Sequence, residues 1–271
     1  MSRIAACLQD LATRGRRAVV PYIVAGDPAP QITVNVMHAL VEAGVDMIEL
    51  GVPFSDPMAE GPVIQLAHER ALAHNVSLRD TLAMVTEFRR DNTHTPVVLM
   101  GYANPVEHMG YEAFAQAAAK AGVDGLLTVD MPPEEAAPLT AALKAAGLDS
   151  IFLLAPTTTD ARIEKVAALA SGFLYCVSLK GVTGAGHLDI GAVEALMQRI
   201  RSHTQLPIMV GFGIQDAATA AAVARVADGV IVGSALVRRM AERAAEHGPN
   251  HATEAVDLIA GMRAAIDALE S

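Results

Sequence analysis

Glu49, Glu60 and the segment between them hold the residue types best suited to proton transfer. Glu49 ends an apolar run, and Glu60 follows it by eleven residues. Two prolines and two glycines between residues 51 and 61 disfavour regular structure, so this segment is predicted to be a loop. Burial raises the pKa of a carboxyl group toward neutrality, which suits it to act as both acid and base. We therefore expect Glu49 to have a chemical role, with a paired structural carboxylate as the alternative.

A glycine-rich stretch, residues 178–186, holds a second candidate, Lys180. A Schiff-base lysine needs a desolvated amine, whereas Lys180 lies beside glycines, which favours a solvated one. The stretch is not a phosphate-binding P-loop, because no Gly-Lys-Ser/Thr follows at the required spacing. It is predicted to be either a closing lid or a flexible surface loop. Tyr175, in the apolar run before it, is either a hydrogen-bond donor to a reacting carboxylate or a half-buried strand residue.

The elements that position these residues alternate between short apolar runs and longer amphipathic segments. A helix is predicted over residues 2–15, before the first strand. Strands are predicted at 18–25, 45–49, 96–101, 123–129, 150–154, 173–177, 207–210 and 229–232. Helices are predicted at 30–43, 62–73, 78–91, up to 121, at 133–146, 160–170, 190–202, 215–226 and from the last strand to the C-terminus.

This alternation predicts a (β/α)8 TIM barrel with an extra N-terminal helix, and a doubly wound open sheet is the alternative fold. No linker or change of composition divides the chain, so residues 1–271 are expected to form a single domain. Barrel active sites lie at the carboxyl ends of the strands. Side chains alternate along a strand, so Val45, Met47 and Glu49 are predicted to share a face, with Glu49 pointing into the barrel mouth. The other candidates at strand ends are Tyr22, Met100, Tyr102, Asp130, Tyr175, Phe212 and Gly233.

Glycine-rich turns follow both of the last two strands. Barrels that bind phosphates do so between these two loops, because glycine lets backbone N–H groups approach an anion closely. The pair of turns, at residues 211–214 and 233–235, therefore predicts a phosphate site if the fold is a barrel. Each turn alone is better explained as a simple connection.

Composition excludes several other classes of protein. The formal net charge of −10 argues against binding to a nucleic-acid backbone. Two distant cysteines, Cys7 and Cys176, make no disulfide or metal framework, and the histidines have no metal-ligand spacing. No apolar segment reaches the length of a membrane span, and the N-terminus has no signal-peptide core. We expect a soluble, cytoplasmic protein without a bound metal.

Four motifs together resemble one enzyme family, the tryptophan synthase alpha subunit. They are Glu-Leu-Gly-Val-Pro-Phe-Ser-Asp-Pro (49–57), Gly-Val-Thr-Gly (181–184), Gly-Phe-Gly-Ile (211–214) and Gly-Ser-Ala (233–235). Tyr22, residues 102–105, Asp130 and Tyr175 also fall where that family would place them. The resemblance covers nearly the whole chain and implies a (β/α)8 barrel that cleaves indole-3-glycerol phosphate to indole and glyceraldehyde 3-phosphate. It implies no cofactor in this chain, and a heterotetramer of two alpha and two beta subunits in which the beta subunit uses pyridoxal phosphate (PLP) to join indole with serine.

The resemblance also implies roles for individual residues. Glu49 would exchange protons with the substrate, Glu60 would polarise the indole N–H, and Tyr175 would assist catalysis. Thr183 would hydrogen-bond Glu60 when the two loops close and exclude water. Substrate contacts are expected from Tyr22, Met100, Tyr102, Leu127, Leu153, Thr183, Phe212 and Ile231, and phosphate contacts from Gly184, Gly213, Gly233 and Ser234.

Glu60 departs from the family, which most often carries Asp at this position. Glutamate keeps the charge but adds a methylene, and a misplacement of about 1 Å costs on the order of 10²-fold in rate.

Three alternatives to the function that the resemblance implies stay open. They are a stand-alone indole-producing lyase, a catalytically weak subunit that activates its partner, and a phosphate-binding aldolase that works through Lys180. The loop at 53–60 and Asn104-Pro105 are placed where a partner would dock across the barrel mouth.

Overall fold

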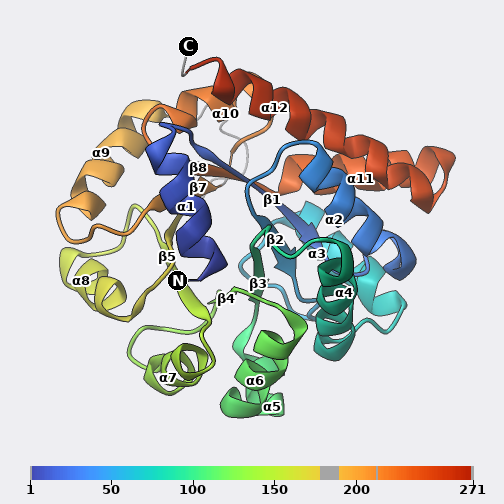
Figure 1. The fold of residues 1–271 in the computed structure, drawn as a ribbon, viewed down its shortest axis with the longest axis horizontal. Coiled ribbons are helices and arrows are strands. Elements are labelled where there is room, and N and C mark those ends of the chain that lie inside the picture. The colour runs from blue at the N-terminus through green and yellow to red at the C-terminus, as the bar shows by residue number, and fades with distance from the viewer. Residues whose placement is uncertain (1, 178–188, 212, 270–271) are drawn as a thin grey trace.

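The computed structural model describes residues 2–177, 189–211 and 213–269, and the predicted barrel is confirmed. Eight parallel strands close in sequence order from β1 to β8, with β8 paired to β1. The strands are β1 (Ala18–Val24), β2 (Ile48–Gly51), β3 (Val97–Gly101), β4 (Gly125–Thr128), β5 (Asp149–Leu154), β6 (Leu174–Val177), β7 (Ile208–Gly211) and β8 (Gly229–Val232). The helices surround them, as Figure 1 shows along the barrel axis.

The helices follow the predicted order, with two differences at glycines. They are α1 (Arg3–Thr13), α2 (Thr33–Glu42), α3 (Pro62–Ala73), α4 (Leu78–Asp91), α5 (Ala103–Met109), α6 (Tyr111–Ala121), α7 (Ala137–Ala145), α8 (Asp160–Leu169), α9 (Ile190–Arg201), α10 (Ala217–Ala224), α11 (Ser234–His247) and α12 (Asp257–Asp267), with 3-10 turns η1 (Pro30–Ile32) and η2 (Pro249–Val256). The predicted helix ending at residue 121 is two helices, since Gly110 takes a left-handed φ of 86°. The predicted last helix is likewise wrong: it breaks at Gly248 (φ 98°) and the following Pro249.

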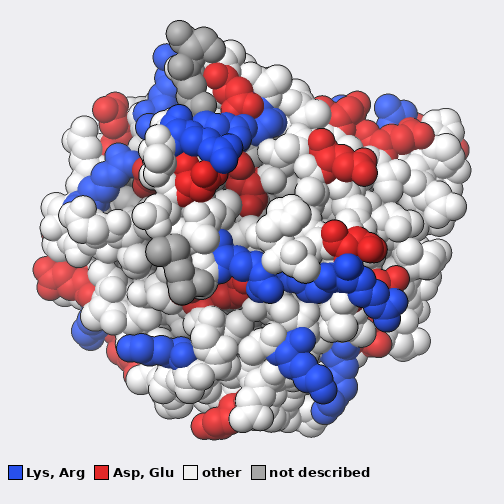
Figure 2. Space-filling model, viewed as in Figure 1, with Lys and Arg blue, Asp and Glu red and all other residues white. Residues whose placement is uncertain are grey.

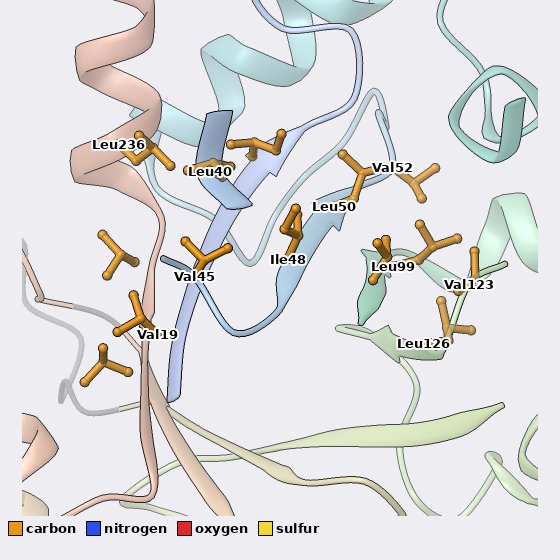
Figure 3. Close-up of a cluster of buried hydrophobic side chains, with 14 of the residues drawn as sticks. Val19, Leu40, Val45, Ile48, Leu50, Val52, Leu99, Val123, Leu126 and Leu236 are labelled. Atoms are coloured by element: carbon orange, nitrogen blue, oxygen red, sulfur yellow. The ribbon is translucent and has the colours of Figure 1, made fainter. Parts of the chain in front are cut away.

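Two apolar layers lie on opposite sides of the barrel wall. Ile48 and Leu50 of β2 face outward and pack with residues of the surrounding helices, such as Leu40 and Leu236 (Figure 3). Met47, just before β2, belongs to the inner cluster. Glu49 therefore points inward as predicted. Val45 precedes the strand and packs in the outer layer, so its predicted place on the same face was wrong.

Helix α1 closes the end of the barrel at which the strands begin, and it lies across that end in Figure 1. Its buried residues, Ile4, Leu8 and Leu11, are spaced to form one apolar stripe. Ile4 reaches the start of β4, where a Cβ atom on Gly125 would lie 3.2 Å from Ile4 Cδ1. The lack of a side chain at Gly125 thus makes room for Ile151 of β5 and for the helix. The opposite end of the barrel remains open for the site.

Aspartates one or two residues before β2, β4 and β8 stabilise the closed end of the barrel. Asp46, Asp124 and Asp228 each accept a backbone N–H from the preceding strand, at 2.8, 2.8 and 2.9 Å. Each also pairs with an arginine; Asp124 binds both Arg3 and Arg89, at 2.8 Å. Figure 2 shows basic and acidic side chains interspersed on this face. These three aspartates therefore stabilise the closed end of the barrel.

Candidate functional site

The open end of the barrel holds a cavity of about 550 Å³. Nine predicted site residues line it together: Tyr22, Glu49, Glu60, Met100, Tyr175, Gly213, Ile231, Gly233 and Ser234. Tyr22 and Glu49 are register partners on neighbouring strands, so their side chains enter the barrel mouth at the same level. The sequence positions of these residues span more than two hundred residues, and the barrel closure brings them to one place.

Glu49 is almost completely buried, and within the described chain neither carboxyl oxygen has a hydrogen-bond partner. Burial, and then the charge of Glu60, raises the pKa of Glu49 to about 8. The carboxyl group is therefore mostly protonated at neutral pH, because that form avoids an uncompensated buried charge. A buried acid that faces an open cavity without a protein partner is positioned to give its proton to a ligand.

Glu60 is held differently from Glu49. The Tyr102 hydroxyl donates a hydrogen bond to Glu60 Oε2 and accepts one from the Ala59 N–H at 3.0 Å. Burial raises the pKa of Glu60, while the Tyr102 hydrogen bond opposes that rise by stabilising the carboxylate. Phe54 stacks on the Tyr102 ring with centroids 4.8 Å apart. The predicted loop after β2 is thus anchored at two points to the end of β3.

Tyr22 and Tyr175 occupy the mouth through the same local arrangement. In each case the hydroxyl lies where a Cβ would stand on a glycine of the next strand, Gly51 for Tyr22 and Gly211 for Tyr175. Each glycine lies two residues beyond the tyrosine's register partner, Glu49 or Met209. Burial raises the pKa of both hydroxyls, so both remain hydrogen-bond donors at neutral pH.

The glycine turns after β7 and β8 form the other end of the cavity. Gly213 has a left-handed φ of 78°, and Ser234 begins helix α11 beside Gly233. Arg238, one turn further along α11, lines the same cavity. Helix N-termini attract anions through their unpaired N–H groups, and the arginine adds positive charge. This end of the cavity has the chemistry of a phosphate site.

Some predicted residues lie elsewhere. Leu127 is fully buried in the barrel interior, and Leu153 packs against the same cluster. Tyr102 contacts Glu60, as described above. Asp130 accepts the Ala103 N–H at 2.8 Å. Thr183, Gly184, Phe212 and Lys180 fall outside the described residues.

Sequence reasoning missed two residues of this region, His68 and Arg238. His68 lies behind the cavity wall on α3 and is almost fully buried. The signal was available, because Ile64, Ala67, His68 and Ala71 follow the spacing of one buried helix face. Arg238 left no such signal, since an exposed arginine on a helix is ordinary.

The described part of the chain contains no cluster of three or more His, Cys, Asp or Glu side chains able to hold a metal ion. None of its helices has the length and apolarity needed to cross a membrane.

Comparison with known proteins gives one consistent result. A family model described as "Tryptophan synthase alpha chain" matches residues 8–267. The chain is 60% identical over 269 residues to the tryptophan synthase alpha chain of Methylococcus capsulatus, covering 99% of this chain and 100% of the relative. It is 61% identical over 268 residues to that of Thioalkalivibrio sulfidiphilus, covering 98% and 100%.

Solved structures agree with this result. Tryptophan synthase subunit alpha from Legionella pneumophila matches with a TM-score of 0.92 and 47% identity, covering 99% of both chains. A tryptophan synthase structure from M. tuberculosis, in an aminoacrylate-bound form, matches with a TM-score of 0.87 and 37% identity, covering 98% of this chain and 100% of the other.

Proposed function

The chain belongs to the tryptophan synthase alpha chain family, and on that premise we propose that Glu49 and Glu60 carry out its chemistry. Members of this family are lyases of tryptophan biosynthesis that cleave indole-3-glycerol phosphate. The observation that carries the proposal is the state of Glu49. It is buried, faces the cavity, has no described hydrogen-bond partner, and has its pKa raised to about 8.

Glu49 acts first as an acid and then as a base. Its protonated carboxyl group gives a proton to the indole ring carbon that bears the glycerol side chain. The resulting carboxylate then takes the proton of the adjacent side-chain hydroxyl. The bond between the ring carbon and the side chain breaks, its electron pair returns to the ring, and the hydroxyl oxygen becomes the aldehyde of glyceraldehyde 3-phosphate. Glu49 ends the cycle protonated, so no other proton source is required.

Glu60 supports the same step as a carboxylate. Protonation of the ring carbon places positive charge on the indole nitrogen, which a carboxylate accepting the N–H hydrogen bond stabilises. The Tyr102 hydroxyl favours this ionised form of Glu60. The Tyr102 contact also supports the function of glutamate in place of the usual aspartate, because it fixes the end of the longer side chain.

The substrate lies across the cavity with its two ends apart. The indole ring contacts the apolar residues of the mouth, among them Met100 and Ile231. The phosphate lies at the N-terminus of α11, against Gly213, Gly233 and Ser234, with Arg238 contributing positive charge. Tyr175 lies on the Glu49 side, where the charge of Glu49 contributes to its raised pKa, and donates to a reacting oxygen. Thr183, Gly184 and Phe212 complete these contacts in the proposal.

The partner proposed for this chain is a tryptophan synthase beta subunit, in a heterotetramer of two subunits of each kind. PLP belongs to that partner. Met58 and Leu66 are 83% and 52% exposed, and they lie on the loop after β2 and on α3, beside the barrel mouth. Such exposed apolar side chains support docking there. We also propose that residues 1–271 act as one domain, in the cytoplasm.

Steady-state cleavage of indole-3-glycerol phosphate, measured on the purified chain with and without a beta subunit, tests the function. Slow cleavage that rises strongly with the partner supports the lyase and its assembly. Fast cleavage that ignores the partner favours a stand-alone lyase. Weak cleavage that stays weak in an otherwise active complex favours a subunit whose main role is activation. Trapping of a covalent adduct with borohydride would instead point to Lys180.

A further inference from the structure

A buried histidine behind the cavity wall joins the loop after β2 to Tyr22. His68 Nδ1 accepts the Phe54 N–H at 3.0 Å, and its Nε2 lies 3.4 Å from the Tyr22 hydroxyl oxygen. His68 is 1% exposed and Tyr22 is 4% exposed. The contacts thus form a chain of three residues from the loop to the cavity.

The Phe54 contact decides which ring nitrogen carries the hydrogen. A nitrogen that accepts a hydrogen bond is unprotonated, so in the neutral ring the hydrogen is on Nε2. Burial lowers the pKa of His68 to about 4, which keeps the ring neutral at pH 7. Nε2–H therefore donates to the Tyr22 oxygen. The hydrogen of Tyr22 is then left for another acceptor.

The position of His68 is independently fixed through its own helix. Arg70, two residues along α3, makes a two-point ion pair with Asp27 at 2.6 and 3.2 Å. Asp27 is nearly fully buried and follows β1, the strand of Tyr22. This pair holds α3 against the end of β1, so the approach of His68 to Tyr22 follows from the packing of α3.

Tyr22 lies between the two ends of the cavity. Its register partner is Glu49, and its ring is 3.6 Å from the position of a Cβ on Gly233. Under the proposed function, the part of the substrate between the reacting carbon and the phosphate is the glycerol chain. Its hydroxyl oxygens can therefore serve as acceptors for the Tyr22 hydroxyl.

We propose that His68 is a positioning residue for the lyase reaction. By donating to the Tyr22 oxygen, it turns the Tyr22 hydroxyl hydrogen toward the glycerol hydroxyls of the substrate, and its Phe54 contact ties this arrangement to the loop that carries Glu60. The inference rests on the proposed function and adds to it a contact to the glycerol chain.

Two substitutions separate the two hydrogen bonds of His68. In His68→Asn, the amide oxygen replaces Nδ1 as acceptor for Phe54, and nothing replaces Nε2. In His68→Gln, the amide nitrogen replaces Nε2 as donor to Tyr22. Tyr22→Phe removes the hydroxyl itself, and His74→Asn, at the exposed end of the same helix, is the control.

The expected result is that Tyr22→Phe and His68→Asn each lower kcat/KM about tenfold, with the double variant no worse than either. His68→Gln is expected to remain within about threefold of the unchanged protein, and His74→Asn to match it. Losses that multiply in the double variant, or equal losses in His68→Asn and His68→Gln, would overturn the proposal. Thermal unfolding of each variant separates these effects from loss of fold.

Nitrogen-15 NMR of the histidine rings tests the assignment without the reaction. The His68 resonances of the unchanged protein are identified by their absence in His68→Asn. They are expected to show a neutral ring with hydrogen on Nε2 at pH 7. The chemical shift of Nε2 is expected to change in Tyr22→Phe. Hydrogen on Nδ1 would contradict the proposal. If the unchanged chain fails to cleave indole-3-glycerol phosphate while the ring keeps this state, the proposed function fails and the histidine assignment stands.

Discussion

At the scale of single residues, the site is defined by two carboxyl groups in different surroundings. Glu49 has no described partner and is kept neutral by burial, whereas Glu60 receives a hydrogen bond from Tyr102 that favours its ionised form. Burial raises the pKa of both carboxyl groups, but only Glu60 has a hydrogen bond that opposes the rise. This difference suits Glu49 to the proposed role of proton donor and Glu60 to that of charge stabiliser.

The raised pKa of Glu49 has a measurable effect on stability. Between its ordinary pKa of 4.5 and the folded value of about 8, the folded state binds more protons than the unfolded state. The free energy of unfolding therefore falls as pH rises through this range. Glu49→Gln is expected to lose this dependence and to be more stable than the unchanged protein at pH 8, by on the order of 3 kcal/mol. The two proteins should converge near pH 5.

Urea unfolding at several pH values checks this expectation. Glu69→Gln, on the exposed side of α3, is the control and should keep the pH dependence of the unchanged protein. If the gain in the free energy of unfolding of Glu49→Gln over the unchanged protein is instead largest at pH 5, the carboxyl group of Glu49 is ionised in the folded state.

The Tyr102 hydroxyl controls the second carboxyl group. In Tyr102→Phe the pKa of Glu60 is expected to rise, because the hydrogen bond that lowers it is gone. Since Glu60 is proposed to act as a carboxylate, the acidic limb of the kcat/KM profile should move to higher pH. Tyr111→Phe removes an exposed hydroxyl that donates to Glu107 at 2.7 Å and should leave the limb in place. A limb that does not move in Tyr102→Phe would show that Glu60 does not set it.

At the scale of elements, two neighbouring strands together position each of the tyrosines Tyr22 and Tyr175. A glycine on the following strand, Gly51 or Gly211, provides the space for the hydroxyl of Tyr22 or Tyr175. Both glycines lie at the same offset from the tyrosine's register partner. The tilt of the strands in a closed barrel explains the offset, because each side chain leans over its neighbour.

Alanine at either of these glycines should displace the tyrosine. Gly51→Ala and Gly211→Ala are expected to lower kcat/KM by about 10- to 100-fold, because the hydroxyls move away from the reacting atoms. Gly261→Ala, where a Cβ meets nothing within 4 Å inside α12, should keep full activity and gain up to about 1 kcal/mol in stability. Full activity in both barrel variants would contradict the account of the tyrosines.

The closed end of the barrel should matter for stability alone. Asp124 joins Arg3, Arg89 and the Val97 N–H on the face opposite the cavity. Asp124→Asn is expected to cost about 3 kcal/mol of stability while kcat/KM of the folded protein stays unchanged. Asp10→Asn, which breaks an exposed pair with Arg14, should cost less than about 0.5 kcal/mol. Denaturant unfolding measures the loss of stability, and kinetics on the same samples measure activity. Lost activity in folded Asp124→Asn would contradict the expectation that the closed end affects stability alone.

At the scale of the whole molecule, the fold was predictable because every strand and most helices have a local signal. Side-chain alternation along the strand correctly predicted that Glu49 points into the barrel mouth, and the glycine turns correctly predicted that Gly213 and Gly233 line the cavity. The broken last helix was missed because helical periodicity alone does not show a break, although Gly248-Pro249 supplied one. The state of Glu49 and the His68–Tyr22 contact were not predictable, since both depend on residues brought together only when the barrel closes.

The central claim is that Glu49 supplies the proton for cleavage, and Glu49→Gln tests it directly. The measurement is single-turnover cleavage of indole-3-glycerol phosphate at saturating enzyme, with substrate affinity measured by titration in parallel. Glutamine keeps the size and polarity of the side chain but has no acidic proton to donate. We predict affinity within a few-fold of the unchanged protein and a cleavage rate reduced by at least about 10³-fold. A rate within tenfold of the unchanged protein, with the substrate fully bound, would contradict the claim.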